Sequence, residues 1–168
     1  MITHRRIEIG NDDQAVLAFY CEIIFGFESP WARQGGFESY RRKWLSTSQP
    51  NFFLSDVRSS MSDPRMVAEL WEESHRPIAY VWATVHDIPE YDFTYAEVRD
   101  IAVAQSHRRQ GLGETIMDYV ESQAMVCGAK VLRSEVGIEN VASQGLHQKV
   151  GYQTYRLLVE KVLEVIEP

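Results

Sequence analysis

The stretch Glu97-Val-Arg-Asp-Ile-Ala-Val-Ala-Gln-Ser-His-Arg-Arg-Gln-Gly-Leu-Gly113 joins a strand pattern to a helix pattern through a short basic turn. The first N–H groups of a helix lack intrahelical partners and carry partial positive charge, so phosphate oxygens bind there when no side chain blocks them. Gly111 and Gly113 keep that approach open, and Arg108 and Arg109 add charge at its rim. The segment therefore predicts a diphosphate-binding turn.

Two well-known glycine loops do not fit this turn. A Walker A loop requires Gly-x-x-x-x-Gly-Lys-Ser/Thr, which is missing from the sequence, and a dinucleotide fingerprint requires a third glycine where Ile116 stands. A second interpretation stays open, in which the turn is only a solvated loop whose arginines pair with nearby carboxylates.

Two motifs resemble one enzyme family. Arg108-x-x-Gly111-x-Gly113 resembles the Gln/Arg-x-x-Gly-x-Gly/Ala signature of the acetyl-CoA-dependent N-acetyltransferases that are related to general control acetyltransferases. Residues 140–152 resemble that family's second motif, Asn-x-x-Ala-x-x-Leu-Tyr-x-x-x-Gly-Phe, with two departures: Ser143 replaces alanine and His147 replaces tyrosine. Together the motifs span roughly the C-terminal half of the chain.

The resemblance implies an α+β, acyl-CoA N-acyltransferase-like fold with a mixed, mostly antiparallel sheet flanked by helices. The sheet should splay open beside the strand that ends at Val103, with acetyl-CoA in the cleft. The implied activity is acetyl transfer from acetyl-CoA to a primary amine of a small molecule or peptide through a ternary complex. The departures at Ser143 and His147 leave a non-catalytic acyl-CoA sensor as the alternative.

Acetyl transfer to an amine requires a base for the ammonium proton. Glu97 is the first candidate, because it lies six residues before Val103, where the histone-acetyltransferase branch of the family carries its catalytic glutamate. The alternative is an exposed strand residue paired with Arg99. Asp100 is the second candidate, and strand alternation predicts that it points to the opposite face from Glu97 unless a bulge intervenes.

His147 is the candidate acid that protonates the leaving thiolate, because an unperturbed imidazole titrates near pH ~6.5. The alternative is a helical histidine that bonds a backbone carbonyl. Asn140 is either a helix N-cap or a ligand of the pantetheine arm. The resemblance places the thioester carbonyl near the N–H of Val103. The predicted cofactor-binding residues are Ile101, Val103, Arg108, Arg109, Gln110, Gly111, Leu112, Gly113, Glu114 and Asn140.

Composition predicts one globular domain over residues 1–168, since 45% of the residues are hydrophobic and 24% are charged. We expect a cytoplasmic protein, because neither a leader pattern nor an apolar span near twenty residues occurs. A net charge of −7 argues against nucleic acid as the main partner. Histidine and cysteine spacings indicate no metal site and two free thiols. A homodimer is compatible with the sequence.

Periodicity predicts a strand over 5–9, a helix from Asn11 to about Gly26, a helix over 37–45 and a hairpin over 67–71 and 78–85. Further along, we expect strands over 95–103 and 131–138, helices over 113–127 and 140–150, and a closing strand over 152–162, buried on both faces around its apolar run at 157–159.

The region 28–65 is rich in breakers and should border the acceptor site. Acidic and tryptophan side chains in and after it would suit a cationic amine. They are Glu28, Glu38, Asp56, Glu69, Asp87, Glu90, Asp92, Trp31, Trp44 and Trp82.

Overall fold

The computed structural model describes residues 1–159 and 161, and its centre is a five-stranded sheet in the order β1-β2-β3-β4-β5. Neighbouring strands run antiparallel except for β4 and β5, which are parallel. The expected mixed, mostly antiparallel sheet is therefore confirmed. The strands are β1 (Ile2–Arg6), β2 (Val67–Glu73), β3 (Arg76–Ile88), β4 (Phe93–Val103) and β5 (Val131–Ser134).

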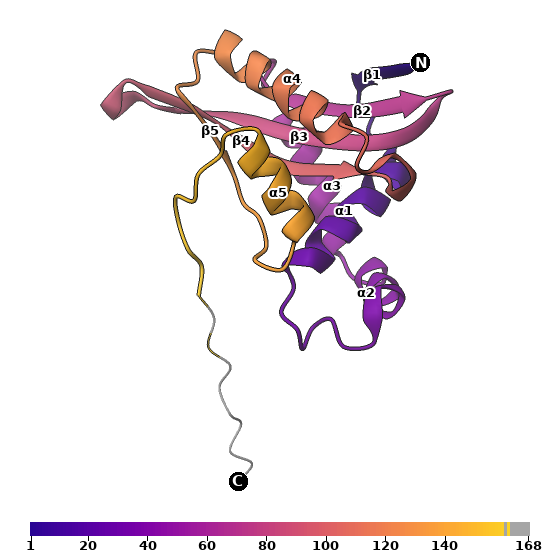
Figure 1. Ribbon diagram of the computed structural model, residues 1–168. Helices are drawn as coiled ribbons and strands as arrows, with labels where there is room; N and C mark the ends of the chain where they lie inside the picture. Colours follow the sequence, from indigo (N-terminus) through magenta and orange to yellow (C-terminus); the bar gives the residue numbers. More distant parts are fainter. Residues whose placement is uncertain (160, 162–168) are drawn as a thin grey trace.

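Helices cover both faces of this sheet (Figure 1). One hydrophobic core joins the first and third helices to β2 and β3, and a second core joins the fourth helix to the opposite face. The α-helices are α1 (Asp13–Phe27), α2 (Gly36–Leu45), α3 (Gln49–Ser60), α4 (Leu112–Val126) and α5 (Val141–Lys149). Two 3₁₀ turns, η1 (Pro89–Tyr91) and η2 (Gln105–His107), flank β4.

The local patterns explain the elements next to the basic turn. In α4, Ile116, Met117, Val120 and Ala124 lie on one buried stripe, as the helical spacing predicts. The predicted hairpin is present and longer than expected, with Ser74 and His75 both at positive φ, the geometry of a two-residue turn that matches strand twist.

A bulge in β4 changes the direction of one predicted site residue. Trp82 pairs with Asp100 while the next residue of β3, Ala83, pairs with Val98, so Arg99 is an extra residue in β4. Because a bulge resets strand alternation, Glu97 and Asp100 both lie on the sheet face that α1 and α3 cover. The bulge is the exception that the prediction allowed for, so the two side chains do not point to opposite faces.

The sheet opens beside the second half of β4. Pairing between β4 and β5 extends only from Tyr95 and Val131 to Val98 and Ser134. Residues 99–103 of β4 have β3 on one side and no strand on the other, within the described residues. The predicted splay next to Val103 is therefore confirmed.

Several element boundaries differ from expectation. The first strand is Ile2–Arg6 instead of 5–9, α1 continues past Gly26, and β5 ends at Ser134 instead of 138. Helix α3 was not predicted, although its buried residues Pro50, Phe53, Leu54 and Val57 have helical spacing. None of the helices in the described part of the chain has the length and apolarity that crossing a bilayer requires.

The closing strand is the largest correction. Residues 152–159 form no regular structure and run away from the sheet (Figure 1), and residues 160 and 162 lie outside the described residues. Leu157, Leu158 and Val159 are almost fully exposed instead of buried on two faces. The apolar run satisfies the pattern of a buried strand, but no strand of the described chain pairs with it.

Candidate functional site

The turn between β4 and α4 has the backbone that an anion site requires. Gly111 is the N-cap of α4 at φ +85°, in the left-handed region that favours glycine, and Arg109 also has positive φ. A Cβ on Gly111 would meet no atom within 4 Å, so this side of the turn is open. Among the described residues no side chain caps α4, which leaves its first N–H groups available to a ligand.

The two arginines of the turn have different surroundings. Arg108 donates from Nε to the carbonyl of Val103 at 2.7 Å and from its terminal nitrogens to Gln105 and to Glu22 of α1. Arg109 is exposed and has no side-chain partner among the described residues. Arg108 therefore braces the turn against β4 and α1, and Arg109 carries the charge that is free to meet an anion.

Gly113 has a packing role that the sequence did not reveal. A Cβ at this position would lie 3.2 Å from Cδ2 of Leu146 in α5. The absence of a side chain thus lets α4 and α5 approach closely, and this contact joins the two sequence motifs in space. Leu112 is buried in the core of that face, so only its backbone can serve a ligand.

The remaining predicted cofactor residues lie in different parts of the structure. Ile101 and Val103 are half-buried on the part of β4 that lacks a second neighbour, and Glu114 pairs with Lys149 of α5 at 2.7 Å. Asn140 caps α5 by accepting the N–H of Ser143 at 3.0 Å, which is the N-cap alternative. Gln110 donates to the carbonyl of Ser106 at 2.9 Å.

Two carboxylates share the face of β4 that α1 and α3 cover. Glu97 Oε2 lies 3.2 Å from Nη1 of Arg99 and 3.6 Å from Nε2 of His86, so it has the ion pair of the alternative interpretation. Asp100 is buried and accepts a hydrogen bond from the Tyr80 hydroxyl at 3.1 Å. Burial raises the pKa of Asp100 to about 7, which is a suitable value for a general base near neutrality.

His147 is buried in α5, with Nδ1 2.8 Å from the carbonyl oxygen of Ser143. Its Nε2 is buried without a partner among the described residues, and its ring packs edge-on against Tyr152. Burial lowers the pKa of His147. The imidazole is therefore neutral near pH 7, with Nδ1–H donated to the backbone, as the alternative interpretation expects.

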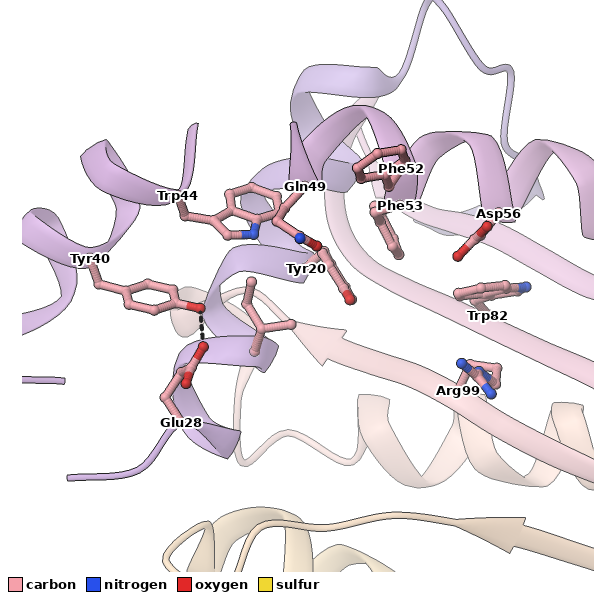
Figure 2. Close-up of a pocket in the computed structure, with 11 residues that line it drawn as sticks. Tyr20, Glu28, Tyr40, Trp44, Gln49, Phe52, Phe53, Asp56, Trp82 and Arg99 are labelled. Carbon is pink, nitrogen blue, oxygen red and sulfur yellow. Dashed lines mark hydrogen bonds between the residues drawn. The ribbon is translucent and has the colours of Figure 1, made fainter. Parts of the chain in front are cut away.

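A pocket of about 280 Å³ lies between α1, α2, α3 and the β3–β4 face (Figure 2). Four of the predicted acceptor-side residues line it: Glu28, Asp56, Trp44 and Trp82. The other six, Glu38, Glu69, Asp87, Glu90, Asp92 and Trp31, do not. Sequence reasoning missed the remaining lining residues, which are Tyr20, Ile24, Tyr40, Gln49, Phe52, Phe53 and Arg99.

The last two predictions concern metal ligands and the cysteine thiols. No group of three or more metal-ligating side chains is found within the described residues. Cys21 is buried and Cys127 is half-buried, and both are free thiols, as predicted.

The chain matches the Acetyltransferase (GNAT) family over residues 29–152. No curated protein matches it. Solved structures of low sequence identity share its fold. An aminoglycoside 6'-N-acetyltransferase of Acinetobacter baumannii is 16% identical (TM-score 0.67), and the match covers 98% of this chain and 99% of that chain.

A putative acetyl transferase of Pyrococcus furiosus is 19% identical (TM-score 0.68), with 97% and 100% covered. An aminoglycoside N-acetyltransferase in complex with CoA is 13% identical (TM-score 0.65), with 98% and 96% covered. At these identities the structures establish a common fold and no more.

Proposed function

Because the chain belongs to the GNAT acetyltransferase family, we propose that it transfers an acetyl group from acetyl-CoA to a primary amine through a ternary complex. The acceptor is a small molecule or a peptide, and it is cationic. One observation carries the proposal: the uncapped N-terminus of α4, with Gly111 open on one side, stands next to the part of β4 that has no second neighbour.

The residues around this opening suit acetyl-CoA, which supplies the activated acetyl group. The amides of residues 111–114 and the free charge of Arg109 would hold its diphosphate. The open edge of β4 at Ile101 and Val103 would pair with the amides of the pantetheine arm, and Asn140 would contact that arm only with the part of its side chain not used in capping.

We propose Glu97 as the base that takes the ammonium proton. A base must come within hydrogen-bond reach of the amine, directly or through one water, and the Glu97 side chain is 24% exposed. Asp100 has the better matched proton affinity, but it is only 7% exposed and requires a water between itself and the amine. Since both lie on one face, they can act on the same acceptor.

We propose His147 as the group that protonates the departing thiolate. This role requires a proton on Nε2, because Nδ1 faces the carbonyl oxygen of Ser143. The lowered pKa of His147 makes such a proton easy to give up and scarce at neutral pH. We therefore expect a His147→Phe variant to lose less than tenfold in kcat, with its largest loss below pH 6, as a pH–rate profile would measure.

Titration calorimetry and product analysis test the proposed function on the full chain. We expect CoA and acetyl-CoA to bind while ATP and NAD do not, and free CoA to appear when a panel of amines is added. Glu97→Gln should lower kcat by about 10²-fold with CoA affinity unchanged, whereas Glu90→Gln, an exposed carboxylate in η1, should change neither quantity.

The outcomes separate the two candidate functions. Binding of acetyl-CoA without CoA release for any amine would identify a non-catalytic sensor. An absence of CoA binding at millimolar concentration would reject both functions.

A further inference from the structure

The pocket between α1, α2, α3 and the sheet has preformed aromatic walls. Tyr20 stacks on Phe53 with ring centroids 3.5 Å apart, and it also packs against Trp44 at 5.9 Å. Phe53 in turn meets the edge of Trp82 at 5.8 Å. Because these four rings pack on one another, this part of the wall is formed without a ligand. The full aromatic set is Tyr20, Tyr40, Trp44, Phe52, Phe53 and Trp82.

Carboxylates stand at the two ends of this pocket (Figure 2). Glu28 lies at one end, where it accepts the Tyr40 hydroxyl at 2.7 Å, and Asp56 lies at the other, near Trp82 and Arg99. Neither Glu28 nor Asp56 has an ion-pair partner among the described residues. An aromatic cavity with two uncompensated carboxylates favours a cation.

Arg99 is the only positive charge among the described residues that line the pocket, and it is already engaged. Its guanidinium lies 5.4 Å from the centroid of the Trp82 ring and is paired with Glu97. Burial raises the pKa of Tyr20 to about 12, and burial and Glu28 raise that of Tyr40, so both hydroxyls stay neutral. Because Arg99 is paired with Glu97, it does not compensate Glu28 or Asp56, so each end of the pocket has a carboxylate that an ammonium group can neutralise.

Resting on the proposed function, we propose that this pocket binds the acceptor and that the acceptor is a compact primary amine with an aromatic or alkyl body. Ring faces attract the ammonium group and bury the apolar body. A volume of about 280 Å³ limits the buried part to a small molecule. Arg99 lies between Glu97 and Asp100 in β4, so the Asp56 end of the pocket, which Arg99 lines, is next to both candidate bases.

The same surfaces disfavour a polyhydroxylated amine. Its hydroxyl groups would face aromatic walls, where a polar group without a hydrogen-bond partner loses free energy. Six of the eleven lining residues carry polar groups, namely Glu28, Tyr40, Gln49, Asp56, Arg99 and the Tyr20 hydroxyl, but three of them, Glu28, Tyr40 and Arg99, are already hydrogen-bonded within the protein.

Three ligands distinguish the contribution of the ammonium charge from that of the apolar body. We expect 2-phenylethylamine to bind at least about tenfold more tightly than 2-phenylethanol, which has the same body without the charge, and than glucosamine, which has the charge on a polar body. Trp44 and Trp82 line the pocket, so quenching of tryptophan fluorescence reports binding without acetyl-CoA. Equal affinity for the alcohol, or tighter binding of glucosamine, would overturn the inference.

Variants at exposed positions locate the binding site with little risk to folding. Asp56→Asn should weaken 2-phenylethylamine about tenfold and leave 2-phenylethanol unchanged, and Phe52→Ala should weaken both. Their matched controls are Glu90→Gln and Tyr91→Ala, an exposed carboxylate and an exposed aromatic outside the pocket, which should change neither affinity. Controls that weaken binding as much as the pocket variants would place the ligand elsewhere.

Failure of this inference is distinguishable from failure of the proposed function. Release of CoA with glucosamine and none with 2-phenylethylamine would retain the enzyme and reject the acceptor class. Specific binding of 2-phenylethylamine without any CoA release would retain the pocket and reject the enzyme.

Discussion

The buried side chain of Asp100 makes the stability of the fold depend on pH. Its pKa is raised to about 7 by burial, whereas an unfolded aspartate has its ordinary value near 3.8. Between these values the folded protein holds a proton that the unfolded chain has released, so the free energy of unfolding falls as pH rises through this window. Above pH 7 the free-energy cost of ionising the buried Asp100 has reached its full value. The difference of about three units between its two pKa values corresponds to at most about 4 kcal/mol.

Asp100→Asn should remove this cost, because asparagine can still accept the Tyr80 hydroxyl and carries no charge. We expect the variant to be more stable than the parent at pH 8, with a gain about 2–3 kcal/mol larger than at pH 5. Urea denaturation at the two pH values measures the difference. Asp118→Asn, at an exposed position of α4, is the control and should give the same result at both. A gain for Asp100→Asn that does not depend on pH would contradict the assigned cause.

Among the elements, those defined by local pattern could be predicted from sequence. The stripe at Ile116, Met117 and Val120 determines which face of α4 is buried, and positive φ at the N-cap requires a residue such as Gly111. Both depend on residues within a few turns of one another. The turn before α4 could therefore be predicted, together with the strand before it and the helix after it.

Features that depend on packing between distant parts of the chain could not be predicted from the sequence. The bulge at Arg99 exists only in the pairing of β4 with β3, so alternation along β4 alone gave the wrong face for Asp100. The contact of Gly113 with Leu146 requires the packing of α4 on α5. The walls of the aromatic pocket come from three helices and two strands, and only the packing of these elements brings the lining residues together.

Alanine substitutions at Gly111 and Gly113 test from which side of the turn CoA approaches. Gly111→Ala should destabilise the protein by about 1–2 kcal/mol through its positive φ, and its methyl group would stand on the open side where the ligand approaches, so CoA affinity should fall at least tenfold. Gly113→Ala should be close to neutral, because the gain of about 1 kcal/mol in helix propensity offsets a small shift of the Leu146 side chain.

Calorimetric titration with CoA and urea denaturation of both glycine variants measure these effects. If Gly113→Ala abolished CoA binding while Gly111→Ala retained it, the ligand would approach from the other side of the turn.

For the whole molecule, CoA binding should appear as added stability, because the proposed site joins β4, α4 and α5, and Arg108 ties the same turn to Glu22 of α1. A ligand at 100 times its Kd adds about 2.7 kcal/mol, which for a chain of this size raises the Tm by about 5–10 °C.

The two arginines of the turn should affect different parts of this behaviour, one the Tm without ligand and the other the Tm shift caused by CoA. Arg108→Ala should lower the Tm without ligand, since it breaks the link from the turn to α1. Arg109→Ala should leave that Tm unchanged and reduce the shift caused by CoA, because its side chain has no partner among the described residues. Thermal unfolding of the three proteins with and without CoA measures both effects, and an equal CoA shift in all three would mean that the diphosphate is held by the backbone of the turn alone.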